Sequence, residues 1–264
     1  ALSSAASDVY KRQGSDVAAL LDKPNNNLAV EYCKAIIEQG VEMQPIALPR
    51  QGADHGQALT ESAHAAFASA SALRALWAEG GAAALAPYVP EKALKLYKQA
   101  EYDGKYTDFA VMGHCELALL RAACTEQAPF AAVRGVSEGL EHRLENAVRE
   151  TASLPALLDA LTTVRYPRAR MRRLAMDAAL GYTAQTPALP PYLHLLGARK
   201  EALPLPGETA LPLSHSLARL ARENETCAQM AAAQSRASDL GALCRAKSEP
   251  MGGIYRQKII FLTN

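Results

Sequence analysis

The segment 164–180 constrains the fold of this chain more than any other stretch of the sequence. Pro167 suits the first turn of a helix, because a residue there needs no N–H partner and the ring fixes φ near its helical value. At 100° per residue, the apolar side chains form one stripe: Met171, Leu174, Ala175 and Ala178. The segment therefore predicts a helix over 167–180 that packs along this stripe.

The same segment carries a dense positive charge. Five arginines fall within nine residues: Arg165, Arg168, Arg170, Arg172 and Arg173. Arg168, Arg172 and Arg173 lie mainly opposite the apolar stripe, near the helix N-terminus, where the helix dipole disfavours cations. Helix stability therefore does not explain the cluster. Two explanations remain open, a bound polyanion or a solvated basic face balanced by acidic neighbours.

The rest of the chain predicts a helix-dominant protein with an α/β piece first. Alanine is abundant and aromatic residues make up 6%, which favours helix over sheet. We expect an α/β piece over 14–85, with a helix over 28–39 ending at Gly40, an alternating strand over 41–48, a loop over 51–62 and a helix from Phe67 to about Glu79. A mainly helical domain over 86–264 follows. Its expected helices cover 91–100, 107–123, 139–151, 154–162, 167–180, 189–196, 214–220 and 238–246, with a strand-like segment over 254–262.

Charge and cysteine usage exclude several classes of protein. The net charge is +1, so a nucleic-acid contact would need a local patch, and nothing indicates a DNA partner. The five cysteines are widely spaced without a CxxC or a Cys/His pair, which supports neither a disulfide framework nor a metal site. No apolar run is long enough to span a bilayer and no signal peptide is present. We therefore expect a cytoplasmic protein with no membrane partner.

The first thirteen residues look foreign to the rest. The string SDVYKRQ over 7–13 reads like the translation of a transposon-derived sequencing adapter, and the chain does not begin with Met. We therefore predict that 1–13 is a non-native, adapter-derived segment that replaces an upstream part of the protein. Such a segment is left out of the fold prediction.

Two short patterns could hold a nucleotide. Asn25 and Asn26 precede the first predicted helix, where side-chain amides and free N–H groups can meet a base or a phosphate, although simple capping also explains them. The pattern Ser69-x-Ser71-x-x-Arg74 places two hydroxyls in a first helical turn and an arginine one turn later. This arrangement suits an anion at the positive end of a helix, because the guanidinium fork pairs with phosphate oxygens.

Taken in order, these and further segments resemble the tRNA(Met) cytidine acetate ligase family of the HIGH-motif nucleotidyltransferase superfamily. The resemblance rests on PNNNLAVEY from Pro24, a predicted strand ending at Arg50, SASALR from Ser69, EGLEHR from Glu138, RYPRARMRR from Arg165, YLHLLG from Tyr192 and SDL from Ser238. It covers the chain from about Leu20 to the C-terminus. The fold it implies is a remnant of a Rossmann-like α/β nucleotidyltransferase domain followed by the mainly α-helical domain.

The resemblance implies an ATP-dependent ligase. Acetate would be activated as acetyl-adenylate with loss of pyrophosphate, and the acetyl group would pass to N4 of the wobble cytidine of elongator tRNA(Met). ATP, with Mg²⁺, would contact Asn25, Asn26, Arg50, Ser69, Ser71 and Arg74. The tRNA phosphates would contact Arg165, Arg168, Arg170, Arg172 and Arg173.

The chain departs from this family at one important place. The glycine-rich, histidine-bearing motif that would position ATP is absent, and we expect the chain to be a fragment that is inactive alone. No catalytic residue is therefore predicted. His55 lies in a predicted surface loop, and His114 is expected in a helix core. Two alternative functions stay open, a noncatalytic helical RNA-binding module and a nucleotidyltransferase with a small-molecule acceptor.

Overall fold

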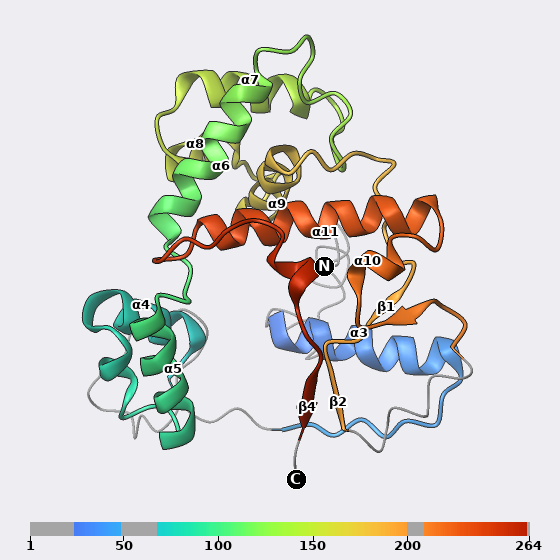
Figure 1. Cartoon of the computed structure of the whole chain (residues 1–264). Helices are drawn as coiled ribbons and strands as arrows, with labels where there is room; N and C mark the ends of the chain where they lie inside the picture. The colour runs from blue at the N-terminus through green and yellow to red at the C-terminus, as the bar shows by residue number, and fades with distance from the viewer. Residues whose placement is uncertain (1–23, 49–67, 200–208, 263–264) are drawn as a thin grey trace, which may run out of the picture. The chain divides into compact units, whose positions relative to one another are not determined.

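The computed structural model describes residues 24–48, 68–199 and 209–262 (Figure 1). The chain divides into two compact units, Ala1–Ala72 and Leu73–Asn264, and each is described by itself. The segment 1–13, Arg50 and the loop with His55 lie outside the described residues. Within the described residues, no helix is both long enough and apolar enough to cross a bilayer.

The first unit contains α3, which covers Pro24–Gln39. Its C-terminal end agrees with the prediction, because Gly40 follows with a left-handed φ of 60° that favours glycine. Its N-terminal end does not. The asparagines were expected to form a turn before the helix, but they lie inside its first turn, since the helix already begins at the proline.

The strand predicted over 41–48 is wrong. These residues make no strand pairing with any described residue, and the hydrogen bond from Met43 N to Val41 O (2.9 Å) is local. A strand needs a neighbour for its backbone groups, and alternation in the sequence does not supply one. The apolar side chains of Met43, Ile46 and Leu48 are 65%, 80% and 88% exposed. The described part of 14–85 therefore contains helices and no strand.

Helix α4 covers Ala70–Gly80, and the 3-10 turn η1 (Ala82–Leu85) and helix α5 (Glu91–Asp103) follow. The Trp77 ring meets the edge of Tyr97 with centroids 5.4 Å apart, which joins α4 to α5. Gly81 allows the turn with φ 67°, and the next residue, Ala82, donates its N–H to Glu101 Oε1 at 3.0 Å. These contacts fix the direction of α4, the helix that carries Arg74.

Four helices form the main core of the second unit: α6 (Phe109–Ala123), α7 (Leu140–Glu150), α8 (Leu154–Leu161) and α9 (Arg168–Ala179). They pack on one another in the part of the chain drawn green to gold in Figure 1. Asp108 caps α6 and Ser153 caps α8 through their side-chain oxygens. The predicted stripe of α9 is confirmed, because its buried residues are Met171, Leu174, Ala175 and Ala178.

The remaining described elements combine short strands with helices. Strand β1 (Leu193–His194) pairs in parallel with β3 (Leu213–Ser214), and β2 (Gly197–Arg199) pairs in parallel with β4 (Ile260–Leu262). The others are α10 (Leu217–Leu220), α11 (Glu225–Leu243) and η4 (Gly253–Arg256).

Three predictions for this part need correction. The helix expected over 189–196 is wrong, because Pro190 and Pro191 lack the N–H that a helix needs and the residues after them pair as β1. The last helix was expected over 238–246, whereas α11 begins at Glu225, where Asn224 Oδ1 accepts a hydrogen bond from Cys227 N at 2.9 Å. The strand-like segment is confirmed only at its end, as β4.

Candidate functional site

Burial of the α9 stripe turns Arg168, Arg172 and Arg173 toward a cavity of about 850 Å³. We call it the arginine cavity. Arg74 of α4 lines it as well, so the structure brings the predicted nucleotide-site arginine together with three of the predicted tRNA-site arginines. Its other walls come from α6, α8 and Met176 of α9. They are largely apolar and include Phe109, Met112, Leu117, Leu154, Pro155 and Leu158.

The cationic side chains of the cavity are mostly uncompensated. Arg168 Nη1 pairs with Asp159 Oδ1 of α8. Arg172 and Arg173 are exposed and make no hydrogen bond or ion pair with any described residue, and the same holds for Arg74. Guanidinium groups that face a cavity without local partners are available to an anion that enters it.

Glu116 is the one carboxylate among the residues that line the arginine cavity. The residue is 1% exposed, and its Oε1 has no hydrogen-bond partner among the described residues. Burial raises the pKa of Glu116 to about 7, and the Arg172 guanidinium opposes this rise. The carboxyl group therefore changes between its neutral and its charged form near neutral pH.

Sequence reasoning missed Glu116, although a signal was present. The residue lies next to Leu117 and four residues before Leu120, both buried, so it falls on the apolar face of α6. His114 was expected in the core, and that prediction is wrong. It is exposed and lines the arginine cavity, with Nδ1 2.8 Å from Ala110 O.

The other two arginines of the segment have partners elsewhere. Arg165 Nη2 pairs with Glu138 Oε2, and the Arg165 guanidinium lies 5.7 Å from the centroid of the Tyr166 ring. The Arg170 guanidinium lies over the same ring at 5.1 Å and donates to Gly135 O at 3.5 Å. Neither lines the arginine cavity. The structure thus divides the predicted five-arginine site into two groups.

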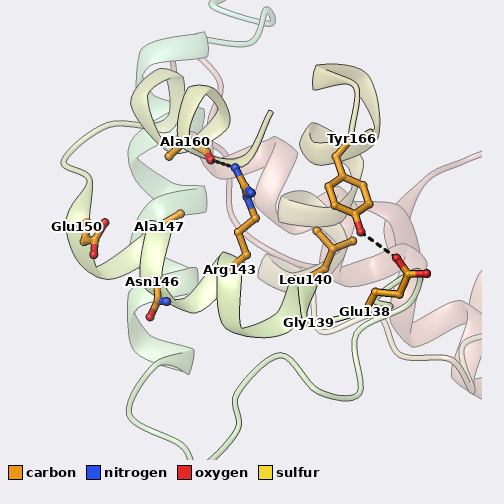
Figure 2. Close-up of a pocket in the computed structure, with 9 residues that line it drawn as sticks. All are labelled: Glu138, Gly139, Leu140, Arg143, Asn146, Ala147, Glu150, Ala160 and Tyr166. Carbon is orange, nitrogen blue, oxygen red and sulfur yellow. Dashed lines mark hydrogen bonds between the residues drawn. The ribbon is translucent and has the colours of Figure 1, made fainter. Parts of the chain in front are cut away.

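Glu138 and Tyr166 belong to a second, smaller hollow of about 450 Å³, which we call the Glu138 pocket (Figure 2). Tyr166 Oη donates to Glu138 Oε2 at 3.4 Å, and Arg143 Nη2 donates to Ala160 O at 2.6 Å, which ties α7 to α8. Glu138 has φ 56°, a left-handed conformation that is strained for a residue with a Cβ. The pocket therefore joins the EGLEHR segment to Tyr166 of the arginine segment.

The predicted nucleotide residues of the first unit have modest structural roles. Ser69 is 3% exposed, and its Oγ accepts from Ala72 N at 3.2 Å and lies 3.0 Å from Ser71 Oγ. Ser69 therefore caps α4. Ser71 and Asn25 are exposed, and Asn26 is half-buried. Within the described ranges, no cluster of His, Cys, Asp and Glu side chains could hold a metal ion.

A family model described as HIGH Nucleotidyl Transferase matches residues 1–251 of the chain. The chain belongs to the HIGH nucleotidyl transferase family. Its relatives include the tRNA(Met) cytidine acetate ligase of Listeria monocytogenes serovar 1/2a, 30% identical over 69% of this chain and 45% of that protein. Another, from Bacillus velezensis, is 28% identical over 76% of this chain and 49% of that protein. The predicted resemblance is confirmed, and the chain spans about half the length of the curated relatives it matches.

Solved structures support the same fold. The chain is similar to the apo structure of Thermotoga maritima TmcAL with a TM-score of 0.79 and 20% identity, over 98% of this chain and 66% of that one. It is similar to the form bound with alpha-thio ATP with a TM-score of 0.77 and 20% identity, over 98% and 65%. The fold is therefore nucleotidyltransferase-like and dominated by helices.

Proposed function

We propose that this chain takes part in an ATP-dependent ligation of acetate to tRNA(Met). In the proposed reaction, an acetate oxygen attacks the α-phosphorus of ATP and pyrophosphate leaves. N4 of the wobble cytidine of elongator tRNA(Met) then attacks the acetyl carbon, loses a proton, and displaces AMP. The observation that carries the proposal is the arginine cavity, where Arg74 shares one lining with Arg168, Arg172 and Arg173.

The chemistry of both steps suits such a cavity. Adenylyl transfer depends on the positioning of charged groups and on neutralisation of phosphate charge more than on a protein nucleophile. Arg74 supplies a guanidinium fork toward phosphate oxygens, as the Ser-x-Ser-x-x-Arg pattern predicts. The relatives are named for this activity, and a TmcAL structure of the same fold is bound with alpha-thio ATP.

We assign ATP and the tRNA phosphates to different residues. We assign ATP, with Mg²⁺, to Asn25, Asn26, Arg50, Ser69, Ser71 and Arg74 from the resemblance. We assign the tRNA phosphates first to Arg172 and Arg173, because these two are exposed and make no hydrogen bond or ion pair with any described residue. Arg168 joins them with its charge partly balanced by Asp159.

A filter-binding experiment with elongator tRNA(Met) tests the proposal. The double variant Arg172→Glu/Arg173→Glu is expected to bind about 10- to 100-fold more weakly at low salt, and its log–log salt slope is expected to be smaller by about 2, one for each lost phosphate contact. Arg222→Glu is the matched control, because Arg222 is exposed and lies outside the arginine cavity. Unchanged affinity and slope would contradict the tRNA assignment.

Equilibrium dialysis with ATP separates the alternatives. Arg74→Ala is expected to weaken ATP binding about tenfold, the loss of one charge-assisted contact. A chain that binds tRNA but not ATP would favour the noncatalytic RNA-binding module. A chain that binds ATP but not tRNA would favour a nucleotidyltransferase with a small-molecule acceptor.

A further inference from the structure

Glu116 gives the arginine cavity a second kind of binding group. Its carboxyl group is almost fully buried, lines the cavity, and leaves Oε1 without a hydrogen-bond partner among the described residues. A buried acceptor without a partner is unfavourable unless a ligand satisfies it. A ligand that enters the cavity and donates a hydrogen bond to Glu116 Oε1 would therefore be favoured.

The surroundings of Glu116 narrow the class of ligand. The titratable and charged groups that share the cavity are His114 of α6, Arg74 of α4, and Arg168, Arg172 and Arg173 of α9. Apolar side chains such as Phe109, Leu154 and Leu158 form the walls. This lining suits a nucleotide of an RNA strand. The arginines can bind its phosphates, the apolar walls can contact its flat base, and the buried acceptor can bind a donor on the base.

We propose that the arginine cavity takes up a single cytosine base of an RNA strand, with Glu116 accepting a hydrogen bond from its exocyclic amine. This inference rests on the proposed function, which supplies tRNA(Met) as the RNA. A carboxylate is a natural acceptor for cytosine N4, whereas uracil turns a carbonyl oxygen toward the same place. The volume of about 850 Å³ admits a base with its sugar and phosphate.

The inference makes Glu116 a residue that determines base specificity. A base must leave its stack to enter such a cavity, and the arginines and the apolar walls contribute to any base equally. The carboxyl group alone then distinguishes cytosine from uracil. A glutamine at this position would remove the distinction, because its amide can accept from the cytosine amine or donate to the uracil carbonyl.

The test compares three transcripts of elongator tRNA(Met), with cytosine, uracil or adenine at the wobble position, by filter binding at about pH 8, above the pKa of Glu116, where its carboxylate can only accept a hydrogen bond. The unchanged chain is expected to bind the cytosine form about tenfold more tightly than the uracil form. For Glu116→Gln, the affinities for the cytosine and uracil forms are expected to differ by less than about threefold, a smaller ratio than one hydrogen bond typically gives. Glu150→Gln, a matched change in the Glu138 pocket, is expected to keep the tenfold gap.

Each result bears on the inference. Equal binding of the cytosine and uracil forms by the unchanged chain, or a tenfold gap that survives in Glu116→Gln, would overturn it. Adenine binding as tight as cytosine binding would overturn the assignment to cytosine. Circular dichroism and the unfolding midpoint show whether Glu116→Gln is folded. The proposed function fails differently, since tRNA affinity would then be insensitive to Arg172→Glu/Arg173→Glu with every base.

Discussion

The arginines of the segment 164–180 fall into two groups that are neighbours in the sequence but have different surroundings. Arg165 and Arg170 contact Tyr166, and Arg165 pairs with Glu138. Arg172 and Arg173 line the arginine cavity and have no ion pair with any described residue. Within α9, the buried stripe separates Arg170 from Arg172 and Arg173, whereas Arg165 precedes the helix and pairs with Glu138. A run of like charges in a sequence therefore overstates the charge that is available to a ligand.

A substitution in the buried apolar stripe of α9 should have the largest effect on the free energy of unfolding. Met171 is 0% exposed and belongs to the core of α6 to α9. Met171→Ala is expected to lower the free energy of unfolding by about 2–5 kcal/mol, because it removes buried apolar surface and leaves a cavity. Urea unfolding measures this loss, and Ala169→Gly, an exposed change on the same helix, should cost about 1 kcal/mol. Equal losses for the two would show that the stripe does not anchor α9.

On the side of the arginine cavity, the pH dependence of folding stability tests the burial of Glu116. Its pKa rises from 4.5 to about 7 on folding, so between these values the folded chain holds a proton that the unfolded chain has released. The contribution of Glu116 to stability therefore falls as pH rises from 4.5 to 7 and is constant above. Glu116→Gln is expected to match the unchanged chain near pH 4.5 and to be more stable above pH 7, by on the order of 2–3 kcal/mol.

Thermal unfolding of both chains across pH 4.5–8 checks this difference. Arg74, Arg168, Arg172, Arg173 and His114 share the cavity with Glu116, so they belong to both chains and cancel in the comparison. A difference that stays constant with pH would mean that the Glu116 carboxyl group does not titrate in this range. A difference of the opposite sign would mean that Arg172 stabilises its charged form.

The smallest effect on the free energy of unfolding is expected from the ion pair between Arg165 and Glu138. The side chains of Arg165 and Glu138 are 68% and 56% exposed, so water screens their ion pair. Arg165→Gln is expected to change the free energy of unfolding by less than about 1 kcal/mol. Chemical unfolding at low and high salt measures it, and a loss several times larger would show that this pair is structural and not a surface contact.

Patterns that depend on neighbouring residues in the chain could be predicted. The apolar stripe of α9 follows from helical spacing, and the end of α3 follows from the left-handed freedom of Gly40. The order of the short motifs identified the family, although each motif alone is weak.

Features that depend on distant partners could not be predicted. The alternation over 41–48 could not show that no described strand would pair with it. The partner of Arg165 is Glu138, which lies 27 residues earlier, and Glu116 becomes a site residue because α8 and α9 bury it. The spacing of α6 places Glu116 on its apolar face, but the cavity that Glu116 lines also needs α8 and α9, which only tertiary packing brings there.

A structure of this chain bound to elongator tRNA(Met) would show which arginines contact RNA. We expect RNA phosphates within hydrogen-bond distance of Arg172 and Arg173, in the arginine cavity, with Arg165 still paired to Glu138. RNA phosphates on Arg165 and Arg170, with no RNA in the arginine cavity, would contradict this expectation.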